Sequence, residues 1–145
     1  MKTWRRFRAL SARDRYLIVE AASLLFLTRT GLSILPFSLV RRVLCAVPQS
    51  SHPSSPDSAG RVAWAVMAAA GDFPMRTTCL VNALACEAMF KRRRWPCDLR
   101  FGVQLPIAHS NVLEAHSWIE YDGRVVLGAV ENLDAYRVLS SENER

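Results

Sequence analysis

The chain has 145 residues, of which 50% are apolar and 22% are charged. A chain of this length can bury one core, and its charge content excludes disorder over most of its length. The formal net charge of +6 is uneven, because residues 1–47 carry nine basic and two acidic side chains. A basic segment faces nucleic acid, an anionic membrane or an acidic partner, or is a solvated helical face. Residues 48–145 carry ten basic and eleven acidic side chains, so the charge predicts no nucleic-acid partner for the rest of the chain.

Residues 12–47 have the apolar spacing of two helices. The first begins after an N-cap at Ser11 and is expected to end at Thr30-Gly31. Pro36 suits the first turn of the second helix, and Ser33 is one possible cap. The apolar run 17–27 is about half of the roughly 20 residues that a membrane span needs. We therefore expect no span, and peripheral membrane contact stays open.

The remaining pattern divides the chain into a basic N-terminal helical segment (1–47), a Ser/Pro linker (48–58) and a core (59–140), within a single domain. The core opens with an Ala-rich helix over 59–70. A second helix follows Thr77 or Thr78, either of which can cap it, and ends before Trp95-Pro96. Its basic end over 91–94 suits a helix C-terminus better than a nucleic-acid patch.

Alternating residues predict strands over 98–105, 113–121 and 124–130. The dipeptide Asp122-Gly123 is typical of a type I′ hairpin turn between the last two strands. The polar tail from residue 131 is expected to fray. Helices followed by a small antiparallel sheet make an α+β domain.

The four cysteines are too sparse for a disulfide scaffold and lack the spacing of a zinc site. We expect reduced thiols, no metal and a cytoplasmic protein. Cys79 stands at the first turn of a predicted helix, where unpaired N–H groups favour a thiolate. His116 on a following strand could serve as its base. The alternative is a small buried thiol and a core histidine. The other cysteines are interpreted as structural: Cys45, Cys86 and Cys97.

Two motifs, CLVNAL at 79–84 and HSWIEYDG at 116–123, resemble the transglutaminase-like leader peptidases of lasso-peptide biosynthesis. The resemblance implies a transglutaminase- or papain-like fold and a cysteine peptidase that needs no cofactor. Cys79 would be the nucleophile, and His116 the base that later protonates the leaving amine. The implied partners are the precursor peptide, a separate leader-recognition protein and an ATP-dependent, asparagine-synthetase-like cyclase. The recognition protein is expected because the chain has no room for such a domain before residue 12.

Two alternatives stay open: an acyltransferase on the same fold, and a non-catalytic protein-binding module. In the first, the acyl-enzyme chemistry is shared and only the acceptor differs. In the second, the N-terminal helices dock a partner and Cys79 is simply buried.

The residue that orients His116 is harder to predict. Related sequences often place Asp about a dozen residues after the histidine, but here that position is Gly128. With a two-residue turn at 122–123, His116 faces Ala129, and Glu131 becomes a diagonal neighbour on the same face. Glu120 and Asp122 lie too far along the strand. We therefore predict Glu131, followed by Asp134 and by Asn132.

Two further features of the site are expected. The backbone N–H of Cys79 is an expected oxyanion donor. Trp118 either lines the substrate cleft or is a core aromatic residue of the sheet.

Overall fold

The computed structural model describes residues 7–46, 57–74, 76–104 and 113–139. Four helices come first: α2 (Ala12–Ile34), α3 (Phe37–Cys45), α4 (Asp57–Gly71) and α5 (Cys79–Arg92). They are followed by β1 (Asp98–Gln104), β2 (Glu114–Tyr121), β3 (Arg124–Leu127), the short 3-10 helix η1 (Leu133–Ala135) and β4 (Arg137–Leu139). The α+β class is confirmed. Most of the expected linker, 48–56, lies outside the described residues, whereas positions 57 and 58 are helical.

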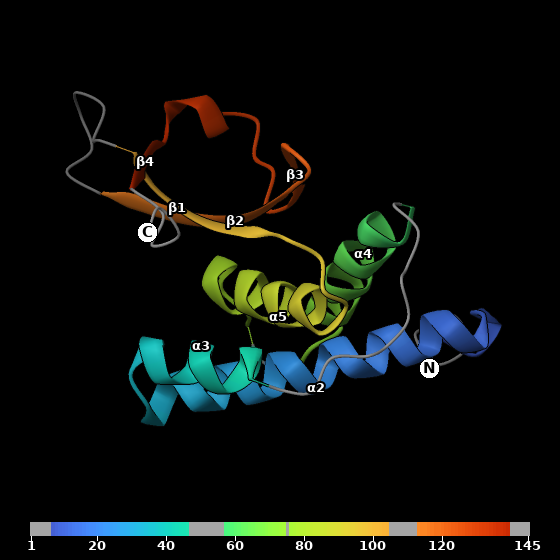
Figure 1. The fold of residues 1–145 in the computed structure, drawn as a ribbon. Helices are drawn as coiled ribbons and strands as arrows, with labels where there is room; N and C mark the ends of the chain where they lie inside the picture. Colours follow the sequence, from blue (N-terminus) through green and yellow to red (C-terminus); the bar gives the residue numbers. More distant parts are fainter. Residues whose placement is uncertain (1–6, 47–56, 75, 105–112, 140–145) are drawn as a thin grey trace.

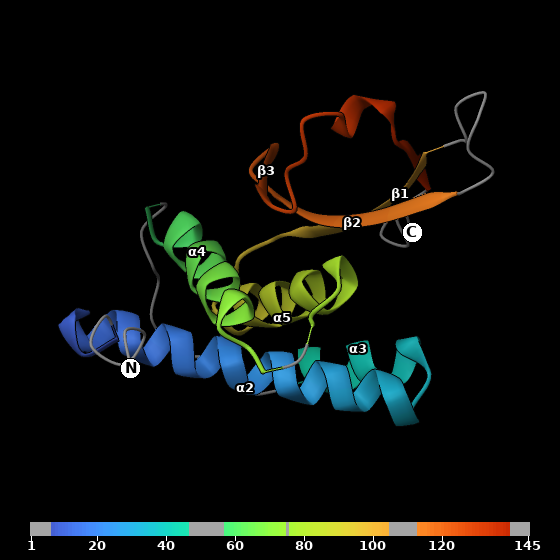
Figure 2. The same cartoon turned by 180° about the vertical axis from the view of Figure 1, so that it is seen from behind.

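The helices and the sheet form three layers (Figures 1 and 2). The sheet is one outer layer, α4 and α5 lie beneath it, and α2 and α3 form the opposite side. Helix α5 is the central element, and it packs against α2, α3, α4 and the sheet. Its side chains from Val81 to Phe90 are almost all buried. The basic N-terminal segment is therefore part of the core, to which Leu17, Leu24 and Leu25 contribute.

Helix α2 begins as expected and ends later than expected. The Ser11 hydroxyl caps it by accepting from the Asp14 backbone N–H at 3.1 Å. The helix passes through Gly31, whose missing side chain leaves room for Val40 of α3. It stops before Pro36, since the residue before a proline disfavours helical geometry. The predicted stop at Gly31 is therefore wrong, and Ser33, one possible cap of the next helix, lies inside α2, while Pro36 is the N-cap of α3.

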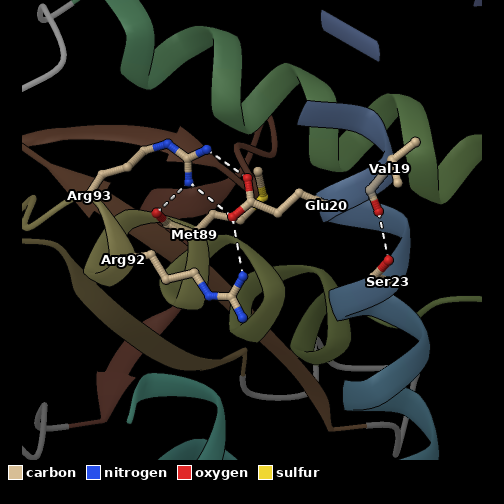
Figure 3. A network of polar contacts seen from close by, with 6 residues as sticks. All are labelled: Val19, Glu20, Ser23, Met89, Arg92 and Arg93. Atoms are coloured by element: carbon tan, nitrogen blue, oxygen red, sulfur yellow. Dashed lines mark hydrogen bonds and ion pairs between the residues drawn. The ribbon is translucent and has the colours of Figure 1, made fainter. Parts of the chain in front are cut away.

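A largely buried carboxylate of α2 connects this helix to the C-terminal end of α5 (Figure 3). Glu20 accepts from Arg93 Nη2 at 2.7 Å and lies 3.4 Å from Arg92 Nη1. Arg93 also donates to the Met89 carbonyl, which fixes its guanidinium against α5. Removing one partner of such a pair leaves an uncompensated charge and typically costs about 3–5 kcal/mol.

Two further carboxylates join the remaining helices. Asp14 of α2 accepts from Arg61 of α4, with Nε–Oδ1 at 2.8 Å. Glu87 of α5, which is fully buried, is held by Arg41 of α3 at 2.8 Å and by Lys91 at 2.9 Å. Each helix of the bundle is therefore attached to a neighbour by an acid that is buried or largely buried.

The strand order is β3-β2-β1-β4, with antiparallel pairing throughout. Asp122 and Gly123 both have positive φ, which confirms the tight turn between β2 and β3. Leu99 and Ile119 face each other on the side of the sheet that covers the helices. Because side chains alternate along a strand, His116 and Trp118 belong to the opposite face.

The second strand of the hairpin differs from the prediction in both register and length. The register shifts by one residue between Ile119 and Glu120, and β3 ends at Leu127 where the prediction had 130. Gly128 then turns with φ +85°, and the chain to η1 crosses the outer face of the sheet (Figure 1). The tail from 131 was expected to fray, but residues 137–139 form β4 against β1. This pairing joins segments far apart in sequence, which local patterns do not reveal.

The lowered pKa of Asp14 predicts how the stability of the protein changes at low pH. The hydrogen bonds from Arg61 and then from Ser11 lower its pKa from 3.8 to about 2. Its contribution is therefore complete above pH 3.8 and is lost as pH falls toward 2. In urea unfolding between pH 5 and about 2, the difference in stability between wild type and Asp14→Asn should shrink with acid. A difference that stays constant with pH would contradict this role.

Candidate active site

Cys79 is the first residue of α5, and the preceding threonine creates this helix start. Thr78 has extended backbone geometry, and its hydroxyl accepts from the Val81 backbone N–H at 3.3 Å. Thr78 is therefore the N-cap of α5, and it is one of the two threonines that the sequence indicated for this role. Cys79 itself is half-buried. Its N–H lies in the first turn, where a helix leaves donors without internal partners.

The other three cysteines are less suited to act as nucleophiles. Burial is the main cause that raises the pKa of Cys45 and of Cys86 above the usual value of a thiol. Burial likewise raises the pKa of Cys97 to about 12. Thiols that stay protonated react slowly, which supports their interpretation as structural residues.

His116 is held by a main-chain oxygen. Its Nε2 lies 2.7 Å from the carbonyl oxygen of Gly128, which can only accept a hydrogen bond. Nε2 must therefore carry the proton, which leaves Nδ1 as the basic nitrogen of the neutral ring. The acceptor that fixes the tautomer is thus the backbone of Gly128, at the position where the resemblance led us to look for an aspartate.

Trp118 supports the imidazole from the side. The two rings stack with centroids 6.2 Å apart and planes 18° from parallel. The indole N–H donates to Glu120 at 2.9 Å, and Arg100 in turn donates to Glu120 at 3.1 Å. At 2% exposure Trp118 has almost no surface left for a substrate, so it acts here as a buried aromatic residue rather than a cleft wall.

Tyr136 lies beside the imidazole of His116. Its ring centroid lies 5.6 Å from that of His116, and its hydroxyl donates to Glu114 at 3.4 Å. The pKa of Tyr136 is raised, first by desolvation, then by the charge and hydrogen bond of Glu114, and also by the charge of Cys79. Tyr136 is therefore a ring neighbour of His116, and the charge of Cys79 also acts on its hydroxyl.

In the part of the chain that the structure describes, no contact between Cys79 and His116 is recorded. Helix α5 packs against the face that carries Ile119, while His116 lies on the other face. Catalytic hydrogen bonds are commonly long in apo enzymes and tighten when substrate binds. The roles of Cys79 and His116 stay predictions.

The structure removes the geometric argument for Glu131 as the residue that orients His116. The argument for Glu131 needed His116 to face residue 129, but β3 ends before that position. Glu131 and Asp134 are exposed, and Asn132 is hydrogen-bonded to Gln104 at 3.2 Å. Within the described ranges, none of the three has a recorded contact with His116, so their role also stays a prediction.

Three features of the site were missed: the Gly128 carbonyl, Tyr136 and Gly102. A main-chain acceptor leaves no side-chain signature, although the glycine at 128 was the visible departure from the pattern. A Cβ at Gly102 would lie 2.8 Å from Trp118 Cζ3 and 2.9 Å from Tyr136 Cβ. Gly102, directly opposite His116 in the sheet, thus lets both rings pack over β1. A glycine in an alternating strand signals such a close approach.

The comparisons with known proteins agree with this arrangement. The family model described as the Transglutaminase-like superfamily matches residues 22–141, which is most of the chain. Neither the curated proteins nor the solved structures gave a match. Among the described residues there is no group of three or more His, Cys, Asp or Glu side chains that could hold a metal ion.

Gly128 should tolerate a side chain much less than Gly123. Both have positive φ, but a Cβ at Gly128 would lie 2.9 Å from the Ser117 carbonyl oxygen and 2.9 Å from Trp118 Cβ, whereas one at Gly123 meets nothing within 4 Å. Each alanine pays the left-handed backbone cost, and crowding adds about 1–3 kcal/mol at Gly128 only. Urea unfolding of Gly128→Ala and Gly123→Ala measures the difference, and equal losses would contradict the close approach.

The hydrogen bond to Gly128 predicts the tautomer of His116. At a pH where the ring is neutral, ¹⁵N spectra should show Nε2 protonated and Nδ1 unprotonated, because the carbonyl accepts only from an N–H. His52 and His109 provide internal comparisons, identified by substituting each in turn. An Nδ1-protonated ring at His116 would refute the assignment.

Proposed function

Because the chain belongs to the transglutaminase-like superfamily, which includes cysteine peptidases and acyltransferases, we propose that it removes the leader from a ribosomally made lasso-peptide precursor. Members of the superfamily typically act through a catalytic cysteine. The observation that carries the proposal is the hydrogen bond from His116 Nε2 to the Gly128 carbonyl, which leaves Nδ1 as the free basic nitrogen of the ring.

The reaction begins when the Cys79 thiol gives its proton to His116 Nδ1 and its sulfur attacks the carbonyl carbon of the scissile peptide bond. The negative charge passes to the carbonyl oxygen, toward which the backbone N–H of Cys79 can donate. When the tetrahedral intermediate collapses, the C–N bond breaks. The imidazolium then protonates the leaving amine, which is the new N-terminus of the core peptide.

The second half of the reaction restores the enzyme. His116 takes a proton from water, whose oxygen attacks the thioester and releases the leader as a carboxylic acid, and the sulfur leaves as the protonated thiol. Throughout the cycle Nε2 keeps its proton and its bond to the Gly128 carbonyl. This neutral acceptor fixes the orientation and tautomer of the ring, but it supplies no full negative charge to the imidazolium.

Leader removal implies proteins that act beside this chain. In the proposed role, a separate recognition protein brings the leader to the peptidase. A separate ATP-dependent, asparagine-synthetase-like enzyme then closes the ring on the freed amine. The precursor and both proteins are expected to be encoded beside this chain.

Replacing either catalytic residue tests the proposal. With the precursor and recognition protein encoded beside this chain, mass spectrometry should detect free leader and core. Cys79→Ala should reduce release by at least about 1,000-fold, since no thioester can form. His116→Ala should reduce it by about 100- to 10,000-fold through loss of acid–base catalysis.

Cys45→Ala is the matched control, because it removes a thiol outside the site, and it should keep wild-type cleavage. Leader release by Cys79→Ala would overturn the catalytic assignment and favour the binding module. Hydroxylamine added to the wild-type reaction distinguishes the acyltransferase alternative. A peptidase gives mainly the leader acid, whereas a transferase gives mainly the leader hydroxamate.

A further inference from the structure

The side of α2 that faces away from the core is apolar. Its large side chains are about half or more exposed, and Ile34 reaches 81%. We call these residues the outer stripe of α2: Tyr16, Val19, Phe26, Leu27 and Ile34. At 100° per residue they lie opposite the buried positions of the helix, which include Leu17 and Leu24. A helix that is apolar on both sides is typical of an element covered on both sides.

The hydroxyl groups between these side chains are satisfied within the helix. Ser23 donates to the Val19 carbonyl at 2.9 Å (Figure 3), and Thr30 donates to the Phe26 carbonyl at 2.8 Å. Such bonds to the preceding turn leave few donors that require water. Helical serine and threonine residues use the same arrangement in apolar surroundings. The outer stripe is thus less polar than its sequence suggests.

The charge beside this stripe is basic. Arg15 and Arg29 are exposed on α2. The acidic residues of the helix, Asp14 and Glu20, point inward, where they pair with arginines of α4 and α5. An apolar stripe flanked by arginine is complementary to a membrane that contains anionic lipid.

The contacts that α2 makes with the rest of the protein limit how it could bind a membrane. By length and composition the helix could cross a bilayer, and the core helix of a water-exposed protein passes the same test. Insertion across the bilayer would break the ion pairs of Asp14 and Glu20 and expose the core. The helix lies on the side of the molecule opposite the sheet, so it can rest on a surface without leaving the fold (Figures 1 and 2).

We propose that the outer stripe of α2 binds the surface of an anionic membrane, with the helix in the plane of the interface. The proposal is independent of leader cleavage. The stripe enters the boundary between headgroups and acyl chains, and Arg15 and Arg29 contact lipid phosphates. The sheet and the candidate active site then face away from the bilayer.

Flotation of the full chain with vesicles tests this docking. The protein should float with phosphatidylcholine vesicles that contain 30% phosphatidylglycerol, much less with phosphatidylcholine alone, and less again in high salt. Phe26→Glu should weaken binding at least about tenfold, because an exposed ring that inserts is replaced by a charge that anionic lipid repels. Arg29→Glu should also weaken it.

Matched controls lie on the opposite layer. Leu139→Glu changes a β4 residue that is 49% exposed, close to the 52% of Phe26, and Arg137→Glu changes an exposed arginine of the same strand. Both should bind vesicles like wild type, with folding of all variants checked by circular dichroism. Three results would overturn the proposal: no preference for anionic vesicles, equal loss in the controls, or self-association that Phe26→Glu abolishes without vesicle binding.

Discussion

The position of α5 depends on acids that are removed from water together with their partners. Glu20 holds its C-terminal end against α2, and Glu87 holds its middle against α3. Isolated buried carboxylates would be strongly unfavourable, so each requires its cation in place. These pairs limit the relative movement of the helices because a shift separates charges in a medium of low dielectric constant. Cys79 begins the helix that they hold, so contacts far from the thiol help to determine where it lies.

The sheet packs against α5 with one face and carries the residues around His116 on the other. One face supplies Leu99 and Ile119 to the core, which anchors the strands against the helix. The other face carries His116, Trp118 and Glu120, whose contacts form a continuous series. Glycine at 102 and 128 lets rings and backbone come close enough for this series to form. The imidazole is therefore oriented by packing and by a carbonyl, where a side-chain acid was expected.

Much of the fold follows from the sequence because it rests on local chemistry. Thr78 identifies the start of α5, and Asp122-Gly123 identifies the turn, since each requires a particular side chain or backbone angle. The errors arise where distant segments decide the outcome. Gly31 is a helix stop locally, but contact with Val40 makes it an interior residue.

The catalytic roles of Cys79 and His116 stay predictions, but the surroundings of the imidazole show which of its neighbours the sequence could indicate. The alternation along β2 places His116 and Trp118 on one face, which the structure confirms. The orienting partner could not be found by counting residues, because the register shift and the early end of β3 changed which atoms face the ring. No local pattern in the sequence predicts the turn before Tyr136. This residue lies beside His116 because β4 pairs with β1.

The unequal charge of the chain has a structural reason. Residues 1–47 contain nine basic and two acidic side chains. Both acids point inward and are neutralised by arginines from α4 and α5, outside this segment. The inward side of α2 therefore takes up the negative charge of the segment, and its outward side is more basic than the net count indicates. The two sides of α2 thus have similar hydropathy but different surroundings. An average over the sequence cannot distinguish them, whereas the fold buries one side and exposes the other.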